Sequence, residues 1–396
     1  MQRVTDLVDI KQQNVKTIID AIRHRPESTK KEIAAATGLS VATVSNLCNE
    51  LIDMLILESQ KSTAARIGRA PERISLKQGR FYNVVLDFRL ENVLHMAIMT
   101  LQNEIYYKVA LDITQFGDAQ ALIDHVASVF RQTVRLLHLE DAVFLRVGAA
   151  VPAIHDSNDG RLKTSTIPII DNFPLKQALT DAFGFLSYVD NVTKFTALSV
   201  YARTRNENPI VNLDVSQGIG AGIIVNGALL RGQNGYGSEI AHVPVGGPDE
   251  VCPICGRTGC AETLLSVRGM SDLMPGIPKS LPLLMRWQQF VALMREDTEQ
   301  SRRIARRIGL QLGRVATILI NLFDPGFFCI SGYITEIRDL VRPCVEEEIN
   351  ARCPMSIERG LKVEWLENAF DDVYIGINEA LFEGWNPFAE RASEPQ

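Results

Sequence analysis

Hydrophobic residues recur at helical spacing near the start of the chain. Val15, Ile18, Ile19 and Ile22 lie three or four residues apart, which places them on one face of an α-helix. Pro26 follows, and a proline inside a helix removes a hydrogen bond and clashes with the preceding turn. The pattern therefore predicts an amphipathic helix that ends before Pro26.

Two shorter helices are predicted next. Thr29 and Glu32 have the spacing of a capping box, and Gly38 marks the end of the first of these helices. Ser40 is the expected N-cap of the second. The buried positions expected on the second helix are Val44, Leu47, Leu51 and Leu55. Two short helices joined by a glycine-containing turn predict a helix-turn-helix.

The segment after these helices has the pattern of a β-hairpin. Leu57 precedes a polar stretch and Leu76 follows it, so two strands are expected to flank a tip that carries Arg66 and Arg69. Arginines at such a tip suit contact with the DNA backbone or minor groove. We therefore interpret residues 1–78 as a winged helix-turn-helix domain.

Charge supports a nucleic-acid role for this domain. Residues 1–80 hold 13 Lys plus Arg against 9 Asp plus Glu, whereas the remainder holds 28 against 38. Small and amide side chains on the second helix suit a major groove. The expected DNA-contacting residues are Ser40, Ala42, Thr43, Ser45, Asn46, Asn49, Arg66 and Arg69. The alternative is a three-helix packing module, but the charge and the arginine wing together favour operator DNA.

The rest of the chain alternates strand and helix patterns. Residues 81–111 alternate apolar and polar positions as hairpin strands do, and residues 118–139 form an amphipathic helical pattern. A long helical pattern at 303–325 leads into an apolar strand at 327–332. This alternation predicts an α/β body long enough for two lobes.

Composition excludes some classes of protein. No apolar run reaches the roughly 18 residues of a membrane span, and the N-terminus lacks an apolar signal-peptide core. We therefore expect no membrane insertion and a cytoplasmic location. Three of the seven Cys lie within nine residues, and in a reducing compartment this clustering favours a metal site over disulfides.

The motifs GIGAGIIVNGALLRGQNGYGSEIAHVPV and CGRTGCAE, behind a winged helix-turn-helix, resemble the ROK family of repressors and sugar kinases. The resemblance implies an α/β body of two actin-like ATPase lobes with a ribonuclease-H-like architecture. Residues 79–190 would form the first lobe, to which a C-terminal helix at 372–390 returns. Residues 191–371 would form the second lobe, with the zinc segment and an oligomerisation surface. The N-terminal domain implies the repressor branch.

Phosphotransfer residues of the family kinases are altered. Those kinases have a D-x-G-G-T loop after their first strand, and here the matching stretch LDFRLEN keeps Asp87 but replaces the small residues. Their catalytic Asn–Asp pair aligns with Asn191 and Val192, and valine cannot accept a proton. A one-residue shift would bring Asp190 into play. We expect no enzyme activity, and the alternative is an ATP-dependent sugar kinase with an added DNA-binding domain.

The resemblance also implies a sugar site. Family members hold sugar hydroxyls with residues that match Asn191, Glu239, His242 and Glu262. Amides and carboxylates suit vicinal hydroxyls because each can bridge two of them. The alternative is that Glu239 and Glu262 are structural carboxylates of a site that no longer binds a ligand.

One imidazole and three thiols match the family's zinc ligands, namely His242, Cys252, Cys255 and Cys260. A filled Cys₃His shell has no open position, so the zinc would be structural. The family has one residue between its first two Cys, whereas this chain has two, Pro253 and Ile254. Two residues are common in zinc knuckles, so we expect ligation to survive. The alternative is three metal-free thiols.

These observations predict a DNA-binding transcriptional regulator, a repressor whose degenerate kinase-like body senses a sugar or sugar derivative. Symmetric DNA half-sites favour a homodimer or tetramer. The resemblance leaves open that a regulatory protein partner, without any small-molecule ligand, controls the regulator.

Overall fold

The computed structural model describes residues 7–61, 72–90, 92–156, 159–163, 165–204, 208–367, 372–383, 385 and 387. The chain divides into two compact units. Unit 1 comprises Met1–Ala149, Lys176–Tyr188 and Ala380–Gln396, and unit 2 comprises Ala150–Leu175 and Val189–Glu379. No helix among the described residues is long and apolar enough to cross a membrane.

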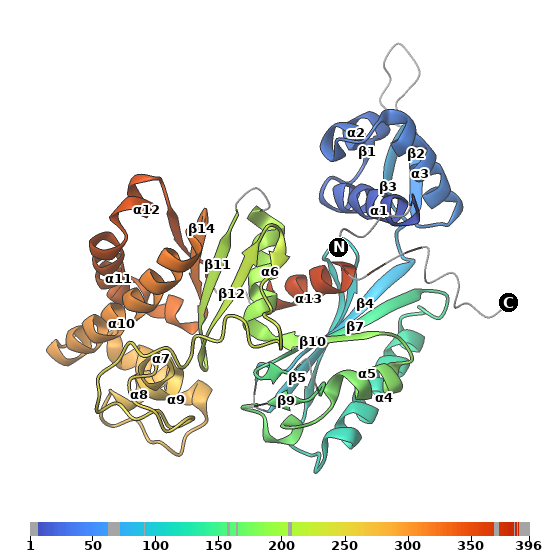
Figure 1. The fold of residues 1–396 in the computed structure, drawn as a ribbon. Coiled ribbons are helices and arrows are strands. Elements are labelled where there is room, and N and C mark those ends of the chain that lie inside the picture. Colours follow the sequence, from blue (N-terminus) through green and yellow to red (C-terminus); the bar gives the residue numbers. More distant parts are fainter. Residues whose placement is uncertain are drawn as a thin grey trace. The chain divides into compact units, whose positions relative to one another are not determined.

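Unit 1 begins with a winged helix-turn-helix, as the sequence predicts (Figure 1). Its helices are α1 (Leu7–His24), α2 (Lys30–Thr37) and α3 (Val41–Asp53). Its strands are β1 (Ser28–Thr29), β2 (Leu57–Lys61) and β3 (Glu72–Leu76), in the order β1-β3-β2. The wing is thus the β2–β3 hairpin, and its tip, with Arg66 and Arg69, lies outside the described residues.

Local signals in the sequence set the ends of these helices. Thr29 and Glu32 form the predicted capping box, and Gly38 ends α2 with φ +69°. Ser40 caps α3 by accepting the backbone N–H of Thr43. Each cap satisfies an amide or carbonyl that the helix itself leaves unpaired.

The prediction for Leu55 is wrong. Val44, Leu47 and Leu51 are buried as expected, but α3 ends at Asp53 and Leu55 is 49% exposed. Leu55 has φ +58°, a left-handed conformation, so the helical periodicity stops before it. Ile56 is buried in its place.

Unit 1 also holds most of a mixed sheet with the order β10-β7-β4-β5-β6. Its strands are β4 (Phe81–Asp87), β5 (Val93–Thr100), β6 (Ile105–Asp112), β7 (Val143–Val151) and β10 (Ser187–Asn191). The helices α4 (Ala119–Leu136) and α5 (Leu175–Phe183) pack beside it. The ring of Phe130 lies 4.8 Å from that of Phe144 and 5.2 Å from that of Phe183, which joins both helices to β7.

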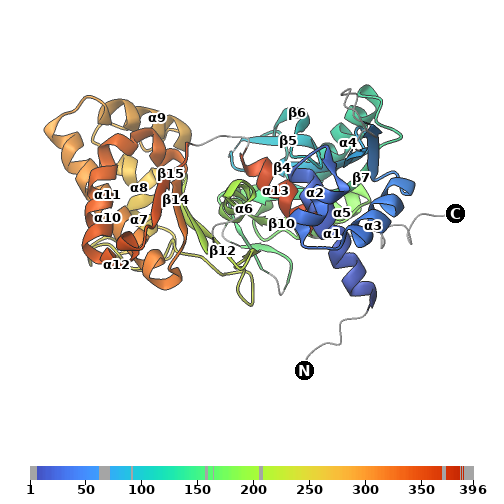
Figure 2. The same ribbon diagram turned by 90° about the horizontal axis from the view of Figure 1, so that it is seen from above.

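Unit 2 is built on a second mixed sheet with the order β13-β12-β11-β14-β15. Its strands are β11 (Ile210–Val215), β12 (Ile219–Val225), β13 (Ala228–Leu229), β14 (Phe327–Ser331) and β15 (Lys362–Trp365). One face is covered by α6 (Val192–Thr204), and α10 (Glu299–Phe323) and α11 (Arg338–Arg352) cover the other (Figures 1 and 2). Two sheets flanked by helices confirm the α/β class predicted for the body.

The remaining helices and strands belong to unit 2, except that α13 crosses the boundary between the units. They are β8 (Ile154–His155), β9 (Leu162–Lys163), η1 (Pro168–Ile170), α7 (Ala261–Leu265), α8 (Val267–Asp272), α9 (Leu283–Met294), η2 (Tyr333–Ile337), α12 (Pro354–Glu358) and α13 (Asp372–Glu383). The sequence-based boundary at residue 190 assigns residues 150–175 to the first lobe, whereas this division assigns them to unit 2.

Glycines in β12 allow α6 to lie against the sheet. A Cβ atom on Gly220 would come 2.6 Å from Thr193 Cγ2, and one on Gly222 would come 2.4 Å from both Ala197 Cβ and the Thr193 carbonyl oxygen. Real Cβ atoms do not approach other atoms this closely, so only glycine fits at these positions. Gly220 and Gly222 therefore have a role in the packing of α6 on β12.

Candidate DNA-binding and ligand sites

The second helix of the helix-turn-helix presents only part of the expected reading surface. Ala42, Asn46 and Asn49 are exposed, whereas Thr43 and Ser45 are half-buried. The Asn49 side-chain oxygen accepts a hydrogen bond from Lys30 Nζ at 2.8 Å. An amide held in this way has its oxygen occupied in the unbound protein.

The cap of α3 also uses groups that were expected to contact DNA. Ser40 Oγ accepts the Thr43 amide at 3.1 Å and lies 2.9 Å from Thr43 Oγ1. The Ser40 hydroxyl therefore caps α3, and the Thr43 hydroxyl contacts this cap. Among the described residues, Asn46 has no hydrogen-bond partner for its side chain. Ala42 and Asn46 are the positions of α3 most open to a base edge.

The stretch that the resemblance aligns with the kinase phosphate loop contains an ion pair. Arg89 Nε lies 3.0 Å from both carboxylate oxygens of Asp87, and Arg89 Nη2 lies 2.7 Å from Oδ2. Asp87 is buried, and the Phe88 side chain between them is fully buried. A bidentate arginine satisfies the carboxylate. The Asp87 carboxylate therefore already has a cation as its partner.

The start of α6 carries a second group of charges, in unit 2. Lys194 is 1% exposed; its Nζ lies 3.2 Å from Asp190 Oδ1 and donates to the Gly235 carbonyl at 2.7 Å. Arg231 Nε lies 3.5 Å from Asp190 Oδ2. Lys194 and Arg231 thus both contact the carboxylate of Asp190, the residue that a one-residue shift of the alignment would place at the position of the kinase base. The four-residue spacing of Asp190 and Lys194 in a helix start was the available sequence signal for this pair.

Asn191 is held by backbone and side-chain groups. Its Nδ2 donates to the Ala153 carbonyl at 3.0 Å, and its Oδ1 accepts from both the amide and the hydroxyl of Thr193 at 2.9 Å. The side chain therefore caps α6. Val192, the position aligned with the kinase base, begins the helix.

Glu239 lies close to this charge group. Burial raises the pKa of its carboxyl, the nearby Lys194 opposes that rise, and Asp190 adds to it. The preceding residue, Ser238, has φ +71°, a conformation that favours glycine. A non-glycine residue in this conformation is strained, and Ser238 places that strain next to Glu239.

Glu262 is positioned by the glycine turn before β12. Its Oε2 accepts the Ile219 amide at 3.1 Å, and a Cβ atom on Gly218 would lie 3.1 Å from that same oxygen. Burial raises the pKa of Glu262 to about 7. The Glu262 amide donates to the Ala241 carbonyl at 2.8 Å, which places this residue beside the segment of His242.

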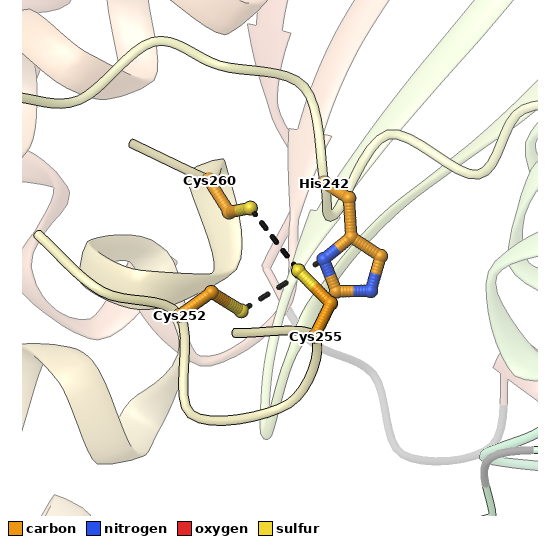
Figure 3. A group of neighbouring side chains, drawn as sticks. All are labelled: His242, Cys252, Cys255 and Cys260. Carbon is orange, nitrogen blue, oxygen red and sulfur yellow. Dashed lines mark hydrogen bonds between the residues drawn. The ribbon is translucent and has the colours of Figure 1, made fainter. Parts of the chain in front are cut away.

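The predicted metal ligands converge on one point (Figure 3). The ligand atoms of His242, Cys252, Cys255 and Cys260 all lie within 4.8 Å of one another. Cys255 Sγ is 3.6 Å from Cys260 Sγ, and Cys252 Sγ is 3.8 Å from His242 Nδ1. Around a tetrahedral Zn²⁺, bonds of about 2.0–2.3 Å separate the ligand atoms by roughly 3.6–3.8 Å.

A small hairpin accommodates the extra residue between the first two Cys. Val251 pairs with Thr258, the Cys252 amide donates to the Arg257 carbonyl at 2.7 Å, and the Gly256 amide donates to the Cys252 carbonyl at 2.9 Å. Ile254 points outward and is 52% exposed. Gly256 and Gly259 have φ angles of +70° and +75°, which let the chain turn so that Cys260 lies beside Cys255.

The pKa shifts of Cys255 and His242 favour the forms that bind a cation, a thiolate and a neutral imidazole. Backbone hydrogen bonding from Arg257 is the largest cause that lowers the pKa of Cys255 to about 7, whereas burial raises that of Cys260 to about 11. Burial also lowers the pKa of His242, and the nearby charge of Arg257 adds to this effect, which favours the neutral imidazole. A divalent cation would favour loss of the remaining thiol protons.

Comparisons with known proteins agree with this architecture. A profile described as the ROK family matches residues 92–363, and one described as the IclR helix-turn-helix domain matches residues 14–61. A xylose repressor of Caldicellulosiruptor bescii is 22% identical over 367 residues, which cover 90% of this chain and 92% of that protein. The transcriptional dual regulator NagC of Escherichia coli K12 is 25% identical over 369 residues, 89% of this chain and 88% of its own.

Solved structures show the same fold. The crystal structure of a ROK family transcriptional regulator, a homolog of the Escherichia coli MLC protein, matches with a TM-score of 0.80 and 19% identity and covers 97% of this chain and all of its own. A ROK hexokinase from Thermus thermophilus matches with a TM-score of 0.60 and 19% identity over 76% of this chain and 98% of its own. The hexokinase match covers a smaller part of this chain than the regulator match does.

Proposed function

Because the chain belongs to the ROK family, and a winged helix-turn-helix precedes its family body, we propose that it is a DNA-binding transcriptional repressor. The helix-turn-helix carries this proposal, since it is a domain that a sugar kinase does not need. Relatives that match over most of both chains are named xylose repressor and N-acetylglucosamine repressor, which supports the same role. Such a regulator acts where the chromosome lies, so we propose the cytoplasm as its compartment.

Selection of bound duplexes from a random DNA library tests the proposal. We expect an enriched sequence with two-fold symmetry, bound through the α3 surface of Ala42 and Asn46. Contacts to phosphates make the affinity fall steeply between low and moderate salt. Asn46→Ala is expected to relax specificity, whereas Lys108→Ala on β6 removes a charge outside the head and serves as the control. Failure to enrich any sequence would refute the proposal.

A sugar or sugar derivative is the proposed effector. Asn191, Glu239, His242 and Glu262 supply the amide, carboxylates and imidazole that suit hydroxyl groups. The printed names of the relatives make D-xylose and N-acetylglucosamine the first compounds to test. Calorimetric titration of the zinc-loaded protein with these sugars is expected to show binding that Glu239→Gln weakens. If no sugar in a broad panel binds, a regulatory protein partner becomes the favoured controller.

We propose that the body has no phosphotransferase activity. Arg89 pairs with the carboxylate of Asp87, which supports the loss of a phosphate-binding loop at this stretch. Lys194 and Arg231 pair with the carboxylate of Asp190, which supports the loss of a catalytic base there. A coupled ATPase assay with hexoses, pentoses and amino sugars is expected to show no turnover above the background. Turnover that Asp190→Ala abolishes would establish the alternative, a sugar kinase with a DNA-binding domain.

Zn²⁺ is the proposed ion of the Cys₃His cluster. The ligand distances and the neutral imidazole fit a closed tetrahedral shell, which would fix the hairpin of residues 251–260 and supply no reactive position. Elemental analysis is expected to find about one zinc per chain. Cys252→Ser is expected to lose the metal, whereas Cys344→Ser, a thiol on α11, is expected to keep it. Full zinc retention in Cys252→Ser would contradict the assignment.

We further propose a homodimer or tetramer formed through a surface of the second lobe, because symmetric operators match symmetric proteins. Light scattering of the purified protein measures its mass directly. A monomer at micromolar concentration that still binds two half-sites would contradict this proposal.

A further inference from the structure

One helix, α13, belongs to both units. The boundary falls inside it, between Glu379 and Ala380, so its first part is in unit 2 and its last part is in unit 1. Both parts are buried: Tyr374 and Ile377 are fully buried in the first, and Phe382 is 4% exposed in the second. A helix built in this way is packed against each unit separately and connected through its own backbone.

In unit 2, α13 rests directly on α6. A Cβ atom on Gly376 would come 1.8 Å from the carbonyl oxygen of Phe195, so the two helix backbones meet without any side chain between them. An ion pair between Asp372 and Arg203 fixes the other point of contact. On its opposite side, α6 lies on the glycines of β12 with similarly close contacts. Because the backbone of α6 contacts these neighbours so closely, a shift of α6 would displace α13 directly.

In unit 1, the last part of α13 packs into the core of the winged helix-turn-helix. Phe382 and Trp385 share one hydrophobic cluster with Ile18, Ile22 and Leu51 of the head. Lys16 of α1 donates to the Glu383 carbonyl at 2.8 Å. The head therefore shares a hydrophobic core with Phe382 and Trp385 and is hydrogen-bonded to the end of α13.

Arg23, in the last turn of α1, holds this junction together. It is 5% exposed, and its guanidinium lies 4.0 Å from the centre of the Phe382 ring. Its Nε donates to the Leu101 carbonyl at 2.6 Å, and Nη2 donates to Asn103 Oδ1 at 3.3 Å, both at the turn between β5 and β6. A buried guanidinium stacked on an aromatic ring and bonded to a carbonyl is costly to displace.

We propose that α13 transmits changes at the start of α6 to the DNA-binding head, with Arg23 as the positioning residue at the head. The proposal rests on the proposed effector site, because Asn191 and Lys194 lie at the start of α6. An effector that moves α6 would shift α13 through Gly376, and the shift would alter how Phe382 and Arg23 hold α1. Effector and operator binding would then be linked through one helix with two packed ends.

Hydrogen exchange tests the coupling without any sugar or DNA, so its outcome is independent of the proposed effector and operator. In the full-length protein, Gly376→Ala pushes α13 away from α6. We expect the amides of α1 in the head to exchange about tenfold faster, within the roughly 5- to 150-fold range usual for coupled sites. Gly313→Ala is the matched control, since its Cβ would lie 2.6 Å from Glu348 Cβ at the α10–α11 contact in unit 2. This control is expected to leave α1 exchange unchanged.

Arg23→Met gives the second arm of the experiment. In that background, Gly376→Ala is expected to add nothing to α1 exchange, whereas in Arg25→Met, which removes an exposed charge two residues later, the response should persist. If Gly376→Ala does not fold, Asp372→Asn breaks the ion pair with Arg203 and is expected to raise α1 exchange about threefold. Unchanged α1 exchange in the α13 variants, or an equal response in Gly313→Ala, would overturn the proposal.

Discussion

Replacing Gly222 by alanine tests whether the glycines of β12 are there to admit α6. The new Cβ would come 2.4 Å from Ala197 Cβ and from the Thr193 carbonyl oxygen, whereas ordinary contacts are 3.4–4 Å. The helix would have to move away by about 1 Å or more, and overpacking of this kind costs about 1–3 kcal/mol. Alanine is better than glycine in a strand by only about 0.5–1 kcal/mol. We therefore expect a net destabilisation of roughly 1–2 kcal/mol.

Urea unfolding followed by tryptophan fluorescence measures this change. Trp385 lies in unit 1, so Trp385→Phe leaves Trp287 and Trp365 to report on unit 2. Gly247→Ala, also in unit 2, is the control, because its added Cβ would lie 3.9 Å from the Glu250 side chain, an ordinary contact, and its φ is not in the left-handed region. This control is expected to be neutral or stabilising by up to about 1 kcal/mol. An unchanged midpoint in Gly222→Ala would refute the packing role of this glycine.

Three further predictions concern single positions. Ser238→Gly is expected to stabilise the protein by about 0.5–1 kcal/mol, measured by urea unfolding, because it relieves a left-handed serine; a loss of stability would show that the Ser238 hydroxyl outweighs the strain. Ser40→Ala removes the cap of α3, so we expect a loss of about 1 kcal/mol in thermal unfolding of the head together with weaker DNA binding, and unaltered unfolding would contradict the capping role. Removal of zinc by a chelator is expected to speed amide exchange in residues 251–260 by tenfold or more, and an unchanged rate would show that the hairpin holds without metal.

Short-range chemistry made much of the fold predictable from the sequence. The capping box of Thr29 and Glu32, the Ser40 cap and the Gly38 stop depend on residues at most four positions apart, and all are present. Leu55 was mispredicted because periodicity does not show where a helix ends. The helix ends at Asp53 without a glycine, and no residue type at that point announces it.

The convergence of His242, Cys252, Cys255 and Cys260 was predictable because these side chains are few and chemically distinctive. Three Cys and a His within nineteen positions of one another suggest a zinc site, and the hairpin brings all four together despite the extra residue. The surroundings of the residues expected to contact DNA were predictable only in part. Asn49 is tied to Lys30 of another helix, a pairing that depends on how two helices cross.

What the sequence determined by itself was local: where helices begin, which faces are apolar, and which side chains can bind a metal or DNA. The tertiary structure alone decided the rest. It buried Lys194 beside Asp190 and Gly235, closed Arg89 onto Asp87 within a buried strand end, and seated Gly376 on the backbone of Phe195. The physical reason is that burial, desolvation and close backbone approach depend on neighbours from distant parts of the chain, so the spacing of two residues in the sequence does not show whether they will be buried together.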